Sequence, residues 1–144
     1  MSTRFVHLHL HTSYSLLDGA CRPEDVVQAA IDNDMPAAAI TDHGGMYGAM
    51  EFYKAARRRG IRPIIGCEID VFPDTRTAGL KPAACTVPPH HLVLLAETDQ
   101  GYYNLIKLVS ASHREGTRQK PGIDKLLLAA HCKGLIALSA CENG

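Results

Sequence analysis

The sequence predicts an α/β fold in which strands alternate with helices. Short apolar runs typical of strands alternate with segments whose apolar residues recur at helical spacing. Histidines and acids follow or end three of the apolar runs, so they are expected to gather at one edge of a sheet. A hydrophobic content of 46% and a charged content of 21% over 144 residues are sufficient for a packed core of one domain.

The first half of the chain predicts three strands and two helices. Apolar residues and histidines alternate in period two over residues 5–10, which predicts a strand. Pro23 suits a first helical turn, and Gly60 suits the end of a second helix. The alternating order predicts parallel strands joined by right-handed crossovers. The expected strands are residues 5–10, 37–41 and 61–72, and the expected helices are residues 23–33 and 47–59.

The second half predicts two more strands and two more helices. Residues 73–90 contain four prolines and are expected to form an exposed connection whose role is left open. Asp124 is expected to cap a short helix, and His113, in the last turn of its helix, to be a surface residue that complements the helix dipole. The expected strands are residues 91–96 and 134–139, and the expected helices are residues 102–113 and 124–131.

Five strands are too few for a closed barrel. A closed eight-stranded α/β barrel usually takes roughly 250 residues. Residues 1–144 are therefore expected to be the N-terminal part of a domain, with the barrel incomplete.

Composition and patterning exclude several protein classes. No apolar run approaches the roughly 18 residues of a membrane helix, and the start of the chain lacks a secretory pattern, so a cytoplasmic protein without membrane contact is expected. An odd number of cysteines with no close pair argues against a disulfide framework and a zinc ribbon. Lys and Arg together number 15, as do Asp and Glu, so no global positive field attracts nucleic acid.

Histidines near the start of the chain have the spacing of metal ligands. His9 and His11 would point the same way from a strand, about 6 to 7 Å apart, which is close enough to ligate one metal or two neighbouring metals. His7 lies one step deeper on the same face and is expected to be packed or hydrogen-bonded in the core. In parallel α/β folds chemistry occurs at the carboxyl ends of strands, where His11, His43 and Glu68 are all expected.

Further residues have two interpretations each. Asp18 either forms a turn or ligates a metal, and ligation is favoured. Asp42 either caps the turn before a helix or orients the adjacent histidine, and the supporting role is favoured. His91 opens its strand and reaches the rim only through a bulge or an irregular barrel, with His90 as the alternative. Cys141, taken alone, is a small apolar residue at a strand end.

The donor types indicate a metal and a reaction. Imidazole, carboxylate and thiolate ligands together suit zinc, manganese or iron better than magnesium, which prefers oxygen. Such metals make hydroxide available at neutral pH and hold the oxygens of a phosphoryl displacement. The sequence therefore predicts metal-dependent cleavage of a phosphoester.

These motifs together resemble the polymerase-and-histidinol-phosphatase (PHP) domain family. The metal motifs are shared by stand-alone PHP phosphatases, whereas the segments around Tyr102 and Leu135 resemble the branch that opens the bacterial DNA polymerase III alpha subunit. The resemblance implies an irregular, TIM-like β/α barrel, here incomplete. The segments that carry it are residues 5–9, 14–19, 40–44, 52–53, 63–68, 91–96, 101–110 and 134–139.

The resemblance also implies a ligand set for a cluster of two or three divalent metals. A late Asp and His of the family pattern have no counterpart in this chain. The positions that match the family ligands are His9, His11, Asp18, His43, Glu68, His91 and Cys141.

The function implied by the resemblance is removal of nucleotides from a DNA primer 3′ end by a multi-metal 3′ to 5′ exonuclease. The domain would belong to a DNA-directed DNA polymerase, with the remainder of the alpha subunit and a separate proofreading exonuclease subunit as partners, and would not polymerise by itself. One alternative is a stand-alone phosphatase acting on small phosphomonoesters. Another is a non-catalytic scaffold that binds the proofreading exonuclease.

Overall fold

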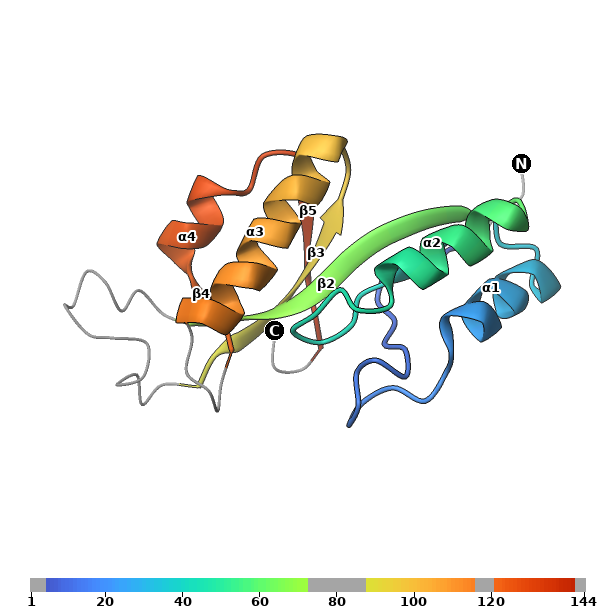
Figure 1. Cartoon of the computed structure of the whole chain (residues 1–144), viewed down its shortest axis with the longest axis horizontal. Helices are drawn as coiled ribbons and strands as arrows, with labels where there is room; N and C mark the ends of the chain where they lie inside the picture. The colour runs from blue at the N-terminus through green and yellow to red at the C-terminus, as the bar shows by residue number, and fades with distance from the viewer. Residues whose placement is uncertain (1–4, 73–87, 116–120, 142–144) are drawn as a thin grey trace.

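A computed structural model describes residues 5–72, 88–115 and 121–141, which form one mixed sheet and four helices (Figure 1). The strand order is β1-β2-β3-β5, and β4 pairs with β2. The strands are β1 (Ala37–Ile40), β2 (Arg62–Phe72), β3 (His90–Ala96), β4 (Ile123–Asp124) and β5 (Leu135–Ser139). The helices are α1 (Pro23–Asp32), α2 (Ala49–Arg58), α3 (Asp99–Glu115) and α4 (Lys125–Ala130). Most of the predicted connection at 73–90 lies outside the described residues.

Local sequence signals predict the helices well. Pro23 is at the first turn of α1, as expected, and acids follow it. Gly60 just beyond α2 has a φ of +77°, a conformation that favours glycine. Asp124 caps α4, because its carboxylate accepts a hydrogen bond of 2.7 Å from the Leu127 amide. None of the helices among the described residues is long and apolar enough to cross a membrane.

The predicted first strand does not form. Residues 5–10 run beside β1 without being part of a strand. The Ala39 amide donates to the His7 carbonyl, and the Thr41 amide donates to the Leu10 carbonyl. The two acceptors are three positions apart in the sequence and the two donors are two positions apart, so the register slips and no continuous ladder results. The expectation for His7 is also wrong, because its side chain is exposed. The structure still contains five strands, with the two-residue β4 as the unexpected one.

The strand directions are mixed. β1 and β2 are parallel, as predicted, whereas β3 pairs antiparallel with β2 and β5 pairs antiparallel with β3. Consequently the start of β3 lies beside the end of β2, and the end of β5 returns to the same edge. His91 therefore reaches this edge without a bulge, although it opens its strand.

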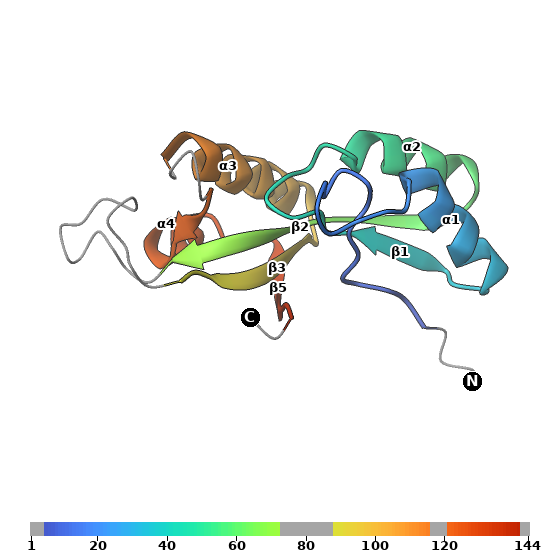
Figure 2. The same ribbon diagram turned by 90° about the horizontal axis from the view of Figure 1, so that it is seen from below.

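The two faces of β2 have different roles. Cys67 and Ile69 pack with Leu105 and Leu108 of α3 in a buried cluster. Figure 2 shows α1, α2 and α3 on one side of the sheet. Glu68, between Cys67 and Ile69, faces the other side, because successive strand residues alternate. One strand thus contributes to the core through one face and to the candidate site through the other.

Cysteine reactivity tests the burial of the helix-covered face. Cys67 is fully buried, and burial raises the pKa of its thiol to about 12. Cys132 and Cys141 are exposed. We expect iodoacetamide at pH 8, with a chelator present, to alkylate Cys132 and Cys141 in the folded chain and to leave Cys67 unmodified, as measured by peptide mass spectrometry. In denaturant all three should react, and rapid labelling of Cys67 in the native chain would contradict this packing.

Candidate metal centre

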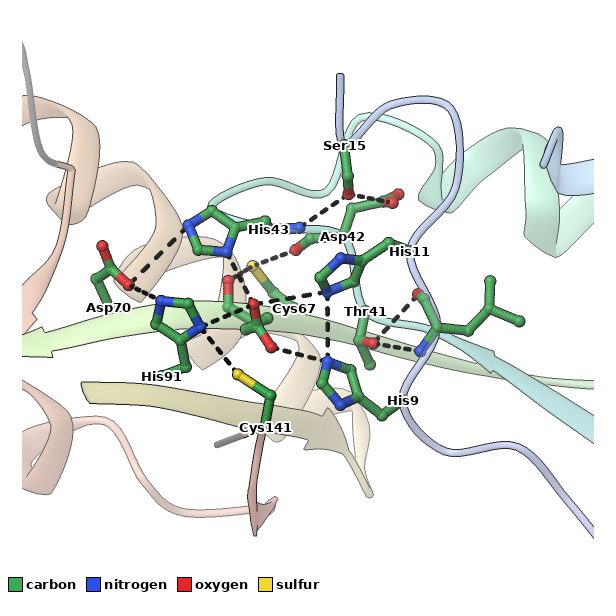
Figure 3. Close-up of polar contacts among 12 residues, drawn as sticks. His9, His11, Ser15, Thr41, Asp42, His43, Cys67, Asp70, His91 and Cys141 are labelled. Carbon is green, nitrogen blue, oxygen red and sulfur yellow. Dashed lines mark hydrogen bonds and ion pairs between the residues drawn. The ribbon is translucent and has the colours of Figure 1, made fainter. Parts of the chain in front are cut away.

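Glu68 is at the centre of the candidate site. Its side chain is only 2% exposed, and four imidazoles surround its carboxylate. Figure 3 shows how His9, His11, His43 and His91 point toward one another. Oε2 lies 2.7 Å from Nε2 of His9. Oε1 lies 2.8 Å from Nδ1 of His43, 3.4 Å from Nδ1 of His91 and 3.6 Å from Nε2 of His11. The structure thus gathers four of the histidines predicted from the sequence around one buried acid.

The four histidines come from three separate segments. His9 and His11 lie in the segment beside β1, and their Nε2 atoms are 3.3 Å apart. His43 lies in the turn after β1, where it forms an isolated parallel bridge with Glu68. His91 lies near the start of β3 and is partly buried, whereas His90 is exposed, so His91 is the residue that the fold places in the cluster.

Asp42 connects two of these segments. Its Oδ1 accepts hydrogen bonds from the Thr12 amide at 2.6 Å and from the Ser15 hydroxyl at 2.8 Å, and Oδ2 accepts one from the Thr12 hydroxyl at 2.9 Å. The Ser15 oxygen in turn accepts a hydrogen bond from the His43 amide at 3.1 Å. Asp42 is buried and lies behind the cluster, so it holds the segments of His11 and His43 together. Sequence reasoning did not identify Thr12 or Ser15, because their roles depend on a contact some 30 residues away.

The remaining predicted ligands are placed differently. Cys141 Sγ lies 3.5 Å from Nδ1 of His91, at the edge of the cluster. Asp18 is exposed, and its amide donates to the Ser15 carbonyl in a tight turn. Asp18 belongs to none of the candidate metal groups found among the described residues.

Two residues near the site were missed by the sequence analysis. Asp70 lies close to His43 and His91, and its signal was present, because it follows Glu68 by two residues on a strand. His113 of α3 donates from Nε2 to the Gly44 carbonyl at 2.6 Å. No sequence signal identifies the contact between His113 and Gly44, because these residues are 69 positions apart.

The electrostatics of the cluster favour an ionised Glu68. Burial opposes ionisation, but the hydrogen bond with His43 and the neighbouring His11, His9 and His91 together lower the pKa of Glu68 below its ordinary value. The same hydrogen bond to Glu68 raises the pKa of His43, with Asp70 adding to this effect. The site therefore combines a buried negative charge with several imidazoles.

Three groups of three side chains could each hold a metal ion. Within each group, one donor atom from every residue lies within 4.8 Å of the other two. Imidazole, carboxylate and thiolate donors at this spacing are suited to holding a metal ion. An α/β domain with such donors gathered at strand ends has the site of a metal-binding protein. The groups are His9, His11 and Glu68; His43, Asp70 and His91; and Glu68, His91 and Cys141.

Comparison with known proteins identifies the family of this chain. The sequence profile of the PHP domain matches residues 7–144, and the chain belongs to the PHP domain family. An amidohydrolase structure from Chromobacterium violaceum, solved with bound sulfate and no metal, is similar at a TM-score of 0.53 and 26% identity. The similarity covers 76% of this chain and 33% of that chain.

Several similar curated proteins are named DNA polymerase III subunit alpha. The DNA polymerase III subunit alpha of Chlamydia trachomatis is 44% identical over 140 residues, which is 97% of this chain and 11% of that protein. The subunit of Borreliella burgdorferi is 44% identical over 99% of this chain and 12% of its own length. That of Aquifex aeolicus is 43% identical over 100% of this chain and 13% of its own length. The chain spans little more than a tenth of the length of these relatives.

Replacing Asp42 tests its connecting role. In Asp42→Ala, the Thr12 amide and the hydroxyls of Thr12 and Ser15 lose a buried charged acceptor. We expect the free energy of unfolding to fall by about 3 kcal/mol, measured by urea denaturation in the presence of a chelator. The control Asp32→Ala removes an exposed carboxylate of α1 and should change stability by less than about 0.5 kcal/mol. Equal effects of the two substitutions would contradict the role of Asp42.

Replacing His113 tests the contact between α3 and the turn that carries His43. Gly44 has a φ of +64°, so this turn has a conformation that glycine favours. Loss of the hydrogen bond in His113→Ala should lower the free energy of unfolding by about 1 kcal/mol and weaken metal binding, measured by thermal unfolding and metal titration. His113→Gln keeps an N–H donor at similar reach and should restore most of both. If His113→Gln and His113→Ala have the same stability and the same metal affinity, the hydrogen bond to the Gly44 carbonyl does not contribute to either.

Proposed function

We propose that this chain is the PHP portion of a bacterial DNA polymerase III alpha subunit, and that the intact PHP domain is a multi-metal phosphodiesterase that removes nucleotides from DNA 3′ ends. The observation that carries the catalytic part is the buried carboxylate of Glu68 among four imidazoles. The similarity to alpha subunits over almost the whole chain supports the polymerase part.

The residues that would hold the metals are those gathered around Glu68. His9 and His11 with Glu68 form one donor group, and His91 with Glu68 and Cys141 forms another. His43 adds an imidazole to the cluster, and Asp18 remains a proposed ligand on the basis of the family pattern alone. Two or three ions of zinc, manganese or iron fit these donors. When bound, such ions lower the pKa of a coordinated water to about 7 and stabilise the oxygens of a phosphoryl displacement.

The protein's own residues give this site its order. Glu68 supplies a negative charge between imidazoles of separate segments. This carboxylate could therefore contribute to more than one metal position. Asp42 fixes the segments of His11 and His43 through Thr12 and Ser15. Cys67 and Ile69 pack on the opposite face of β2 and anchor the strand in the core. The donors are thereby held in place before any ion binds.

The charge balance of the chain favours a local interaction with DNA. Lys and Arg equal Asp and Glu in number, so the chain as a whole does not attract a polyanion. A terminal phosphodiester would instead be attracted by the metal cluster. Under this proposal the remainder of the alpha subunit polymerises DNA and delivers the primer 3′ end to the site.

The proposal is tested with His9→Ala/His11→Ala and with His91→Ala, each in purified protein carrying this domain. Both variants should lose bound metal, measured by elemental analysis, and should lose 3′ to 5′ degradation of a 5′-labelled primer. Metal affinity and activity should each fall by more than the roughly 10-fold to 100-fold seen when a residue that hydrogen-bonds to a metal ligand is removed. The matched control is His90→Ala, because His90 is exposed and adjacent in sequence to His91.

Two outcomes would contradict the proposal. If the unmodified protein binds no zinc, manganese or iron after reconstitution, the catalytic part of the proposal is wrong. Hydrolysis of small phosphomonoesters without attack on primer ends would favour a stand-alone phosphatase instead.

A further inference from the structure

A groove of about 330 Å³ lies between α2 and α3, on the helix-covered side of the sheet. Tyr53 of α2 and Tyr102 of α3 line it, as do Pro63 and Ile65 of β2, which is visible between the two helices in Figure 1. Cys67 lies further along β2 on the same face and is fully buried, whereas Pro63 and Ile65 are only half-buried. The two helices therefore leave this part of the sheet incompletely covered.

The groove is separate from the metal centre. Ile65 packs toward the core beneath α1 and α2, whereas Glu68 leaves the opposite face of β2, because successive strand residues alternate. The proposed cleavage reaction therefore does not use the groove. It also does not account for the segment around Tyr102, which the sequence analysis singled out for its resemblance to the polymerase branch.

The lining of the groove is aromatic and apolar with an acidic edge. Tyr53 is 46% exposed and Tyr102 is half-buried, so both rings have area left to bury against an occupant. Glu97 and Asp99 are exposed at the groove, and within the described part of the chain no lysine or arginine lines it. Asp99 is also favoured locally, because it lies in the first turn of α3, whereas Glu97 precedes the helix. These carboxylates repel the phosphates of a nucleic acid and favour an apolar side chain next to a lysine or arginine.

The size of the groove favours an occupant from the same polypeptide. Its volume of about 330 Å³ is near the lower end of the roughly 300 to 1,000 Å³ of small-molecule sites, so it admits only a few side chains. Stable association of separate proteins usually buries roughly 1,200 to 2,000 Å². A tethered segment has an effective concentration on the order of millimolar and can use a smaller contact. The chain spans little more than a tenth of its alpha-subunit relatives, so such a polypeptide has many segments to offer.

We propose that the groove between α2 and α3 docks a segment from the remainder of the alpha subunit, and that this segment carries an apolar side chain next to a lysine or arginine. The inference rests on the polymerase part of the proposed function, because it requires the rest of that polypeptide. The apolar side chain packs between Tyr53 and Tyr102, and the cation lies beside Glu97. The contact holds the domain from the face away from the metal centre, which stays open to a primer end.

A photo-crosslinker placed in the groove identifies the occupant. In the full-length alpha subunit, p-benzoylphenylalanine replaces Tyr53, and the peptides joined after irradiation are identified by mass spectrometry. Unlabelled and nitrogen-15-labelled subunits are mixed beforehand, so that a crosslink within one chain differs in mass from a crosslink between two copies. The matched control has the same probe at Tyr103, which is exposed on α3 and does not line the groove.

We expect the probe at Tyr53 to join a segment of the same chain outside residues 1–144, with an apolar residue next to a lysine or arginine. The probe at Tyr103 should not join that segment. Crosslinks between two copies, crosslinks confined to residues 1–144, or no crosslink from the Tyr53 position would overturn the proposal.

Two substitutions test the chemistry of the contact. Glu97→Lys reverses a charge at the groove, and Tyr53→Ala removes an aromatic side chain from its lining. In each variant, limited thermolysin digestion should release the domain from the full-length subunit at least about 5-fold faster than in the unmodified protein. The matched controls Asp32→Lys and Tyr103→Ala change exposed residues outside the groove and should be digested at the unmodified rate. Unchanged digestion of both groove variants would overturn the docking.

Two further measurements separate this inference from other failures. Circular dichroism establishes that each variant is folded, and Tyr53→Phe, which keeps the ring, should be digested at nearly the unmodified rate. A full-length subunit that does not extend a primer would contradict the polymerase part of the proposed function. A subunit that extends primers but shows neither the crosslink nor the faster digestion would overturn only the docking.

Discussion

The buried carboxylate of Glu68 is the constraint on which the rest of the site depends. A carboxylate withdrawn from water is costly unless opposite charge or hydrogen-bond donors surround it. Here the partners are imidazoles from three segments, so the N-terminal segment, the turn after β1 and the start of β3 all converge on β2. In the metal-free chain the hydrogen bond with His43 and the three neighbouring imidazoles offset the cost of burying this carboxylate, and the same donors are suited to metal ions.

The position of Glu68 depends on the alternation of β2. Cys67 and Ile69 are buried against α3, which fixes the strand's register and leaves Glu68 and Asp70 on the opposite face. A slip of one residue would exchange the two faces and bury the carboxylates against α3. The hydrophobic core and the chemistry of the site are therefore set by the same strand, and a substitution in one is expected to affect the other.

The N-terminal segment and the turn after β1 are held by polar contacts rather than by a regular ladder, whereas β3 pairs regularly with β2. Residues 5–10 make only scattered backbone bonds with β1, yet Asp42 ties the following loop through Thr12 and Ser15. His113 holds the next turn from the side of α3. These contacts hold His9, His11 and His43 in place although none of the three lies in a strand, whereas Glu68 and His91 lie in β2 and β3.

The sequence by itself determined the helices, four of the five strands and the four histidines and the glutamate gathered at the site. Helix signals such as Pro23, Gly60 and the Asp124 cap act within one or two turns, so a local pattern contains them. Only the tertiary structure decided that residues 5–10 form no strand and that β3 runs antiparallel to β2. It also decided that Asp70 and His113 reach the site while Asp18 remains exposed. These outcomes depend on register and on contacts between segments distant in the chain, which no local pattern specifies.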